Sequence, residues 1–182
     1  MNRAYFEIIR PGIHSTLQDL GRSNQYHIGI PFSGSMDKRN YLISNKLLGN
    51  KLKESSLEFA YQGPLLKLKL GKVSGVITGN VTFNIIRKNS KIEKGFCYQT
   101  FELRDGDQLD IISTNKSVYG YFSIKNGFVG EYIWGSCSVN TKAKIGSNDG
   151  EKFGVNQKIY INKNESLSNN NKIDYFNSKI EF

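Results

Sequence analysis

The amino-acid sequence predicts a mainly β protein, either a barrel or a sandwich, with one early α-helix. Short segments with alternating apolar and polar residues recur at close spacing after residue 55, and glycine-containing turn pairs separate several of them. Only one segment, near residue 40, has apolar residues at helical spacing. A chain of 182 residues is long enough to bury a real core, so we assign one domain to residues 1–161.

The first forty residues predict a strand, a polar loop and the helix. Ala4–Arg10 alternates and is stopped by Pro11-Gly12. The stretch that follows is rich in glycine and polar side chains, which favours a binding loop over a core strand. Lys38–Leu48 is the expected helix, with Asp37 as its N-cap and Gly49 as the residue that ends it.

The rest of the ordered chain is expected to be strands. They are predicted at residues 56–61, 66–70, 73–78, 81–87, 98–103, 108–113, 118–125, 128–133 and 158–161. Three dipeptides between neighbouring segments, Gly79-Asn80, Asp105-Gly106 and Asn126-Gly127, predict two-residue hairpin turns. Residues 162–182 begin with a polar, low-complexity run and are predicted to be a flexible linker with a short tail.

Charge and cysteine content narrow the function classes. The formal net charge is +9, which permits an anionic partner, but the lysines are scattered and no nucleic-acid-binding motif accompanies them. We therefore expect a solvated basic surface and no nucleic acid. No secretory signal or membrane-spanning run is visible, so a cytoplasmic location is expected. The two cysteines, Cys97 and Cys137, lack metal-ligand spacing, and no metal site is predicted.

Three residues of the early loop, Gln18, Asp19 and Arg22, are candidates for substrate chemistry. Arginine is concentrated in residues 1–40, whereas the rest of the chain uses mainly lysine, and a guanidinium can hold a carboxylate in a bidentate pair. Arg22 could bind a substrate carboxylate while Asp19 orients the substrate or acts as a base. Alternatively, Asp19 and Arg22 form an ion pair that pins the loop.

Two further candidates lie next to predicted elements. Ser33, Gly34 and Asp37 precede the helix, where a glycine permits close backbone approach and free N–H groups could bind an anion. Asp37 acting only as a helix cap is the alternative. Glu58 lies between Leu57 and Phe59 on a strand and should point to the opposite face. It is a candidate acid or base if that face lines a site, and has no role if it faces water.

An ordered set of motifs resembles one family. The pattern PG-x-x-ST-x-QD-x-GR is followed by G-x-P-x-SG-x-MD, NKLLGN (45–50), SLEFAYQGPLLKL (56–68), VITGN (76–80) and GYFSIKNGF (120–128). Together they resemble the KipA-like family, which includes the C component of 5-oxoprolinase, allophanate hydrolase subunit 2, and the carboxyltransferase A/B domain of urea amidolyase. The resemblance covers about the first 140 residues and implies a cyclophilin-like β-barrel.

The resemblance also implies a function. It points to the C component of a prokaryotic ATP-dependent 5-oxoprolinase, which converts 5-oxoproline to glutamate together with an A component and a KipI-like B component. Such a component acts on an amide or lactam, is inactive alone, and has access to ATP through the complex. One alternative is a biotin-dependent carboxyltransferase or allophanate hydrolase-type domain acting on urea or amides, with biotin carried by another protein because no biotinyl motif occurs here. Another is a non-catalytic KipA-type regulator that binds a KipI-like partner.

The chain departs from the family pattern in two places. The family continues into a second, related β-domain, and Asp174-Tyr175-Phe176 resembles the beginning of that missing second half. In addition, Cys137 stands where the family places an arginine after its Gly-Ser pair.

Overall fold

The computed structural model describes residues 3–162 and contains eleven strands and one α-helix in that part of the chain. The strands are β1 (Tyr5–Arg10), β2 (Ile13–Gln18), β3 (Ser56–Ala60), β4 (Leu65–Lys69), β5 (Lys72–Thr78), β6 (Val81–Ile86), β7 (Ile92–Lys94), β8 (Thr100–Arg104), β9 (Gln108–Thr114), β10 (Tyr119–Ile124) and β11 (Lys158–Tyr160). The helix is α1 (Lys38–Leu47), and two short 3-10 helices are η1 (Tyr26–Ile28) and η2 (Asn148–Gly150). The predicted linker and tail at 163–182 lie outside the described residues.

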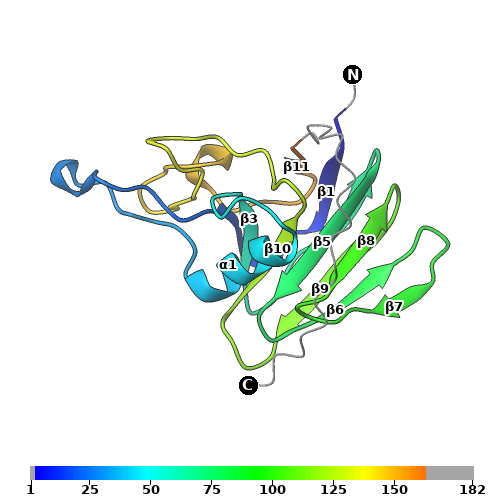
Figure 1. Cartoon of the computed structure of the whole chain (residues 1–182). Helices are drawn as coiled ribbons and strands as arrows, with labels where there is room; N and C mark the ends of the chain where they lie inside the picture. The colour runs from blue at the N-terminus through cyan, green and yellow to red at the C-terminus, as the bar shows by residue number, and fades with distance from the viewer. Residues whose placement is uncertain (1–2, 163–182) are drawn as a thin grey trace.

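The strands form two antiparallel sheets (Figure 1). The first has the order β11-β1-β4-β9-β6-β7, and the second has the order β2-β3-β10-β5-β8. Helix α1 lies over β10 and β5 of the second sheet, and the loop that carries η1 projects away from the body (Figure 1).

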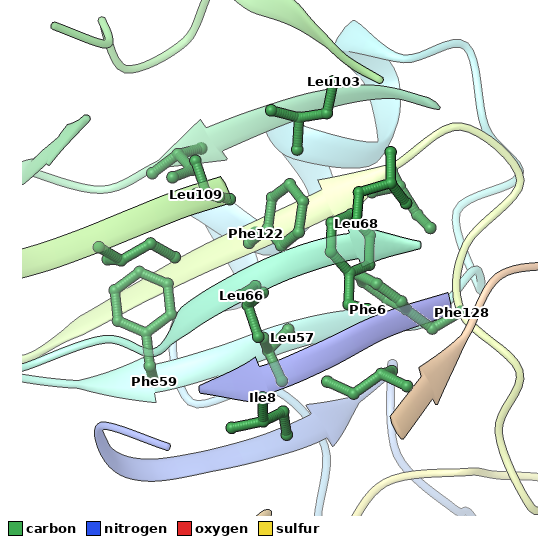
Figure 2. Close-up of a cluster of buried hydrophobic side chains, with 14 of the residues drawn as sticks. Phe6, Ile8, Leu57, Phe59, Leu66, Leu68, Leu103, Leu109, Phe122 and Phe128 are labelled. Atoms are coloured by element: carbon green, nitrogen blue, oxygen red, sulfur yellow. The ribbon is translucent and has the colours of Figure 1, made fainter. Parts of the chain in front are cut away.

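The hydrophobic core lies between the two sheets (Figure 2). Leu66 and Leu68 of β4 are fully buried and alternate with the partly exposed Lys67 and Lys69, as their period-2 pattern predicts. From the second sheet, Phe122 packs its ring edge-on against Phe6 of β1, with centroids 5.4 Å apart.

The prediction of a mainly β fold is confirmed, but the two sheets do not close into a barrel. Within residues 3–162, no hydrogen-bonded strand pair joins an edge of one sheet to an edge of the other. The cyclophilin-like assignment stays a prediction.

The three predicted hairpins are wrong for a common reason. Gly79-Asn80 joins β5 to β6 and Asp105-Gly106 joins β8 to β9, and in both cases the two strands belong to different sheets. The Gly106 N–H donates to Leu68 O of the first sheet (2.9 Å), so this turn carries the chain from one sheet to the other. After Asn126-Gly127 the chain makes one isolated bridge, from Phe128 to Ile161, and no strand follows. A turn dipeptide favours chain reversal without selecting the strand that pairs.

Two other local predictions have opposite outcomes. The helix prediction is confirmed to within one residue: the Asp37 carboxylate accepts the Asn40 N–H (3.0 Å), and Gly49, at φ +60°, follows the C-cap. The segment after Pro11-Gly12 is not all loop, because β2 occupies Ile13–Gln18 and pairs with β3. Its polar side chains are buried by neighbouring segments, which composition alone does not reveal.

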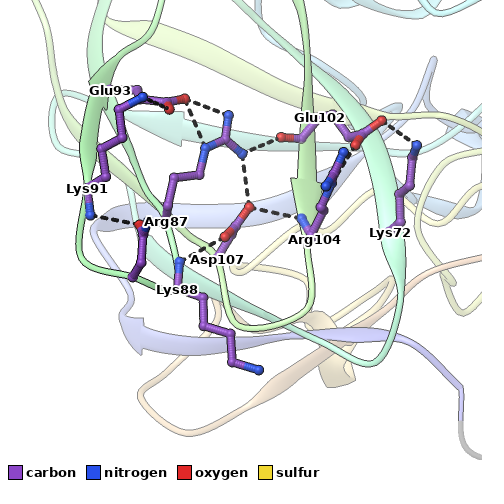
Figure 3. Close-up of polar contacts among 9 residues, drawn as sticks. Lys72, Arg87, Lys88, Lys91, Glu93, Glu102, Arg104 and Asp107 are labelled. Carbon is purple, nitrogen blue, oxygen red and sulfur yellow. Dashed lines mark hydrogen bonds and ion pairs between the residues drawn. The ribbon is translucent and has the colours of Figure 1, made fainter.

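A network of ion pairs joins the far ends of both sheets (Figure 3). The Arg87 guanidinium contacts Glu93 Oε2 (2.6 Å) and Asp107 Oδ2 (2.9 Å), and it donates to the Glu102 carbonyl (2.8 Å). Asp107 also accepts the N–H groups of Lys88 and Arg104 (3.0 and 3.1 Å). Hydrogen bonds from Arg87 and Lys91 hold the pKa of Glu93 at about 2.

We expect Arg87→Met to lower the free energy of unfolding by about 1–2 kcal/mol, because it leaves the almost buried Asp107 carboxylate without its cation, while the partly exposed guanidinium limits the loss. Urea unfolding followed by circular dichroism measures the change. Lys88→Met is the control: its exposed ammonium is 3.9 Å from Asp105, so we expect a change below about 0.5 kcal/mol. Equal effects of the two substitutions would contradict this account.

No helix in residues 3–162 is long and apolar enough to cross a membrane.

Candidate functional site

The outer face of the second sheet, opposite the core, carries two rows of polar side chains, which we call the polar rows. The pairing registers place Thr16 opposite Glu58, Glu58 opposite Tyr121, and Tyr121 opposite Thr78. The second row contains Gln18, Ser56 and Ser123: Gln18 is opposite Ser56, whose hydroxyl is 2.6 Å from that of Ser123. All seven side chains belong to buried residues, so the polar rows are covered by other parts of the chain.

Helix α1 covers one end of the polar rows through polar contacts. The Ser44 hydroxyl lies 2.6 Å from that of Ser123, and Thr78 Oγ1 donates to the Asn40 carbonyl (2.9 Å). The Tyr41 ring packs edge-on against the Tyr121 ring, with centroids 6.3 Å apart. These contacts fix the start of the helix over the sheet.

Glu58 lies beneath the segment that leads into helix α1. Its Oε2 accepts the Met36 N–H (2.8 Å) and the Tyr121 hydroxyl (2.6 Å), and that hydroxyl in turn accepts the Asp37 N–H (2.7 Å). Within residues 3–162, no hydrogen bond to Oε1 is found. The prediction that Glu58 points away from Leu57 and Phe59 is confirmed, because both of these side chains lie in the core.

The environment of Glu58 favours its protonated form. Burial raises the pKa of this carboxyl above its usual range, the hydrogen bonds from Tyr121 and Met36 oppose the rise, and the nearby Asp37 charge adds to it. Burial and the Glu58 charge also raise the pKa of Tyr121, so its hydroxyl stays protonated and donates. A carboxyl with a raised pKa can exchange protons near neutral pH, as a general acid or base must.

Gln18 lies beside Thr16 in the polar rows. Its Nε2 donates to Thr16 Oγ1 (2.9 Å) and to the Val139 carbonyl (3.1 Å). Because a peptide carbonyl can only accept, these contacts fix which end of the amide is the nitrogen. The other atom, Oε1, is buried and has no hydrogen-bond partner among the described residues.

Asp19 is the centre of a buried hydrogen-bond cluster. Its Oδ1 accepts the hydroxyls of Ser136 and Ser138 (2.6 Å each) and the Gly21 N–H (2.8 Å), while Oδ2 accepts the Cys137 N–H (2.8 Å). The Asp19 N–H donates to Ser138 Oγ (2.9 Å). The carboxylate therefore ties the end of β2 to residues 136–138.

Arg22 is buried in the same region and binds protein acceptors. Its Nη1 donates to Ser33 Oγ (2.8 Å), its Nη2 to the Ser138 carbonyl (2.6 Å) and, more weakly, to the Ser136 carbonyl (3.4 Å). Burial lowers the pKa of this guanidinium, and the nearby Asp19 charge opposes the shift. Within residues 3–162 the two side chains form no ion pair within 4 Å, so both act through residues 136–138.

The residues before the helix make mainly internal contacts. Ser33 is bound by Arg22, and a Cβ on Gly34, at φ +89°, would lie only 2.9 Å from Gly21 N, so this glycine allows two stretches of backbone to pack together. Asp37 caps the helix. The N–H groups of Met36, Asp37 and Asn40 are already bonded, and the Asp37 carboxylate adds negative charge. The start of the helix therefore does not fit a phosphate of ATP.

No group of three or more His, Cys, Asp or Glu side chains in the described part of the chain is placed to hold a metal ion. Burial and the neighbouring Asp19 raise the pKa of the Cys137 thiol, which keeps it protonated and unreactive.

The structure adds residues that the sequence reasoning did not select: Thr16, Ser35, Tyr121, Ser136 and Ser138. Tyr121 and Glu58 are 63 positions apart, and Asp19 and Ser136 are 117 apart, so only the strand pairing brings them together. The Gly-Ser motif at 135–136 was a usable signal, because it recurs in the family pattern.

Fold and site together define a two-sheet β protein with a buried glutamate on the covered face of one sheet. A sequence model of the carboxyltransferase domain, subdomain A and B, matches residues 28–180. The chain belongs to this family.

Individual relatives are consistent with this membership. The chain is 29% identical to the C component of 5-oxoprolinase from Haemophilus influenzae over 75% of its length, which is 42% of that protein, and 27% identical to urea amidolyase of Lachancea kluyveri over 90% of its length, which is 9% of that enzyme. The crystal structure of the K. lactis urea amidolyase superposes with a TM-score of 0.83 at 25% identity, covering 91% of this chain and 10% of that one. The chain thus spans less than half the length of these relatives.

Proposed function

We propose that the chain acts as the C component of an ATP-dependent 5-oxoprolinase and that Glu58 is its acid-base group. The observation that carries the proposal is the buried Glu58 carboxyl, with a raised pKa and a hydrogen bond from Tyr121, in a chain of the carboxyltransferase A/B family. The relatives named as the C component of 5-oxoprolinase support this role, because this chain corresponds to a large share of their length and to less than a tenth of urea amidolyase.

The proposed reaction opens the lactam of 5-oxoproline. Water adds at the lactam carbonyl carbon, the C–N bond breaks, and the ring nitrogen takes up a proton to give glutamate. Glu58 would accept a proton from the attacking water and return one to the nitrogen. ATP supplies the driving force. Because the helix start does not fit a phosphate, we assign ATP binding to the partner proteins, the 5-oxoprolinase A component and a KipI-like B component, in the cytoplasm.

A second candidate is carboxyl transfer from biotin, carried by another protein, to a urea or amide nitrogen. The family description and the likeness to urea amidolyase favour it. Here the carboxyl carbon leaves the biotin nitrogen and bonds to the urea nitrogen, whose proton passes to a base. The same Glu58 would serve as that base.

We expect the isolated full chain to be inactive and the complex to be active. The test is co-expression with the two partner proteins, size-exclusion chromatography with light scattering, and an assay of glutamate release from 5-oxoproline with and without ATP. Glutamate release that requires ATP and all three components supports the first candidate. Urea-dependent loss of carboxybiotin from a carrier protein, without glutamate release, supports the second. A pure complex without either activity would contradict both.

A further inference from the structure

Two buried polar atoms near Glu58 have no partner within the described protein. Gln18 Oε1 is one, and the hydroxyl of Ser35 is the other. Both residues are 3% exposed, so bulk water does not account for their hydrogen bonds. A buried polar group without a partner costs stability, which suggests that something outside the described chain satisfies these atoms.

The two residues are held in one region by separate contacts. The Ser35 N–H donates to the Asp19 carbonyl (3.0 Å), next to Gln18, and the following Met36 N–H donates to Glu58 (2.8 Å). Ser35 thus lies between the end of β2 and the Glu58 carboxyl. Gln18 and Glu58 are on the same face of neighbouring strands, because Gln18 contacts Thr16 and Thr16 pairs with Glu58.

The chemistry of these atoms defines a complementary ligand. Gln18 Oε1 can only accept, so it requires an N–H or O–H from the ligand. The Ser35 hydroxyl can donate to a carbonyl oxygen. Glu58 is beside them and favours its neutral form, which disfavours a negatively charged ligand group there.

We propose that Ser35 and Gln18 bind the substrate's neutral N–H and C=O group, with Gln18 Oε1 accepting the N–H and Ser35 Oγ donating to the carbonyl oxygen. This inference rests on the proposed function for its substrate class, an amide, lactam or urea. It adds Ser35 to the site and gives the Gln18 side chain a defined direction of hydrogen bonding.

The test measures binding to the full chain without partners. Pyrrolidinone, a minimal neutral lactam, is titrated while NMR follows the Gln18 side-chain amide and the Met36 backbone amide. We expect saturable shifts, and we expect Ser35→Ala to weaken binding by about three- to tenfold, the effect of one neutral hydrogen bond. N-methylpyrrolidinone lacks the N–H and should bind more weakly than pyrrolidinone.

Thr114→Val is the matched control. Thr114 Oγ1 is also buried without a partner, but it lies on β9 of the other sheet. Neither Ser35→Ala nor Thr114→Val removes a hydrogen bond within the described chain, so both variants should fold with an unchanged or higher melting temperature. Only Ser35→Ala should change the affinity for pyrrolidinone.

Several results would overturn the inference. Absence of saturable shifts would do so, as would equal affinities of Ser35→Ala and the parent chain, the result expected if a buried water alone satisfies both atoms. The proposed function can fail separately: an inactive complex in which this chain still binds pyrrolidinone through Ser35 leaves the site standing. An active complex that is unaffected by Ser35→Ala removes the site and leaves the function.

Discussion

Glu58→Gln is expected to lower the turnover of the assembled complex by about a hundredfold or more while leaving the fold intact. General acid-base groups contribute about 10²–10⁴ in rate, and a glutamine side chain cannot exchange the proton. The fold should survive because the glutamine oxygen can accept from both Met36 N and Tyr121 Oη, as the carboxylate does. The measurement is ATP-dependent glutamate release from 5-oxoproline by parent and variant complexes.

Glu54→Gln is the control for this prediction. Burial also raises the pKa of Glu54, but this residue lies before β3 and outside the polar rows, so its substitution should leave turnover unchanged. If Glu58→Gln retained more than half of the parent activity, Glu58 would not be the acid-base group.

The pH dependence of stability gives this variant a second readout. The folded-state pKa of Glu58 is raised, so its contribution to stability is fully present below the unfolded pKa and is lost as the pH rises through the folded pKa. Glutamine does not titrate. The variant should therefore gain stability relative to the parent chain as the pH rises from acid to mildly alkaline, as measured by urea unfolding.

Asp19→Ala is expected to have the largest effect on folding, a loss of about 3–5 kcal/mol or failure to accumulate as soluble protein. The substitution leaves two buried hydroxyls and two backbone N–H groups without their acceptor, and it removes the charge nearest the buried Arg22. Urea unfolding measures the change where the variant is soluble.

Milder variants keep the Asp19 prediction testable if the alanine variant does not fold. Ser136→Ala and Ser138→Ala each remove hydroxyl contacts to Asp19 and should cost about 1–2 kcal/mol. Asp105→Ala is the matched control, since this exposed carboxylate accepts one backbone N–H, from Leu70, and should cost less than about 1 kcal/mol. An Asp19→Ala variant as stable as Asp105→Ala would show that the cluster does not hold the loop.

The sequence by itself determined the features that depend on neighbouring residues. Alternation placed Leu66 and Leu68 in the core and turned Glu58 away from it, because successive side chains of a strand point to opposite faces. Asp37 and Gly49 marked the two ends of the helix, because capping involves only the adjacent turn. The ordered motifs identified the family before any contact was known.

Only the tertiary structure decided which strands share a sheet and what covers each face. The pairs Gly79-Asn80 and Asp105-Gly106 permit a tight turn, but long-range pairing sends the strands on either side into different sheets. The role of Asp19 depends on a segment 117 residues away, and the hydrogen bond between Glu58 and Tyr121 depends on the pairing of β3 with β10. These contacts arise from packing between distant segments, which no local pattern of residues encodes.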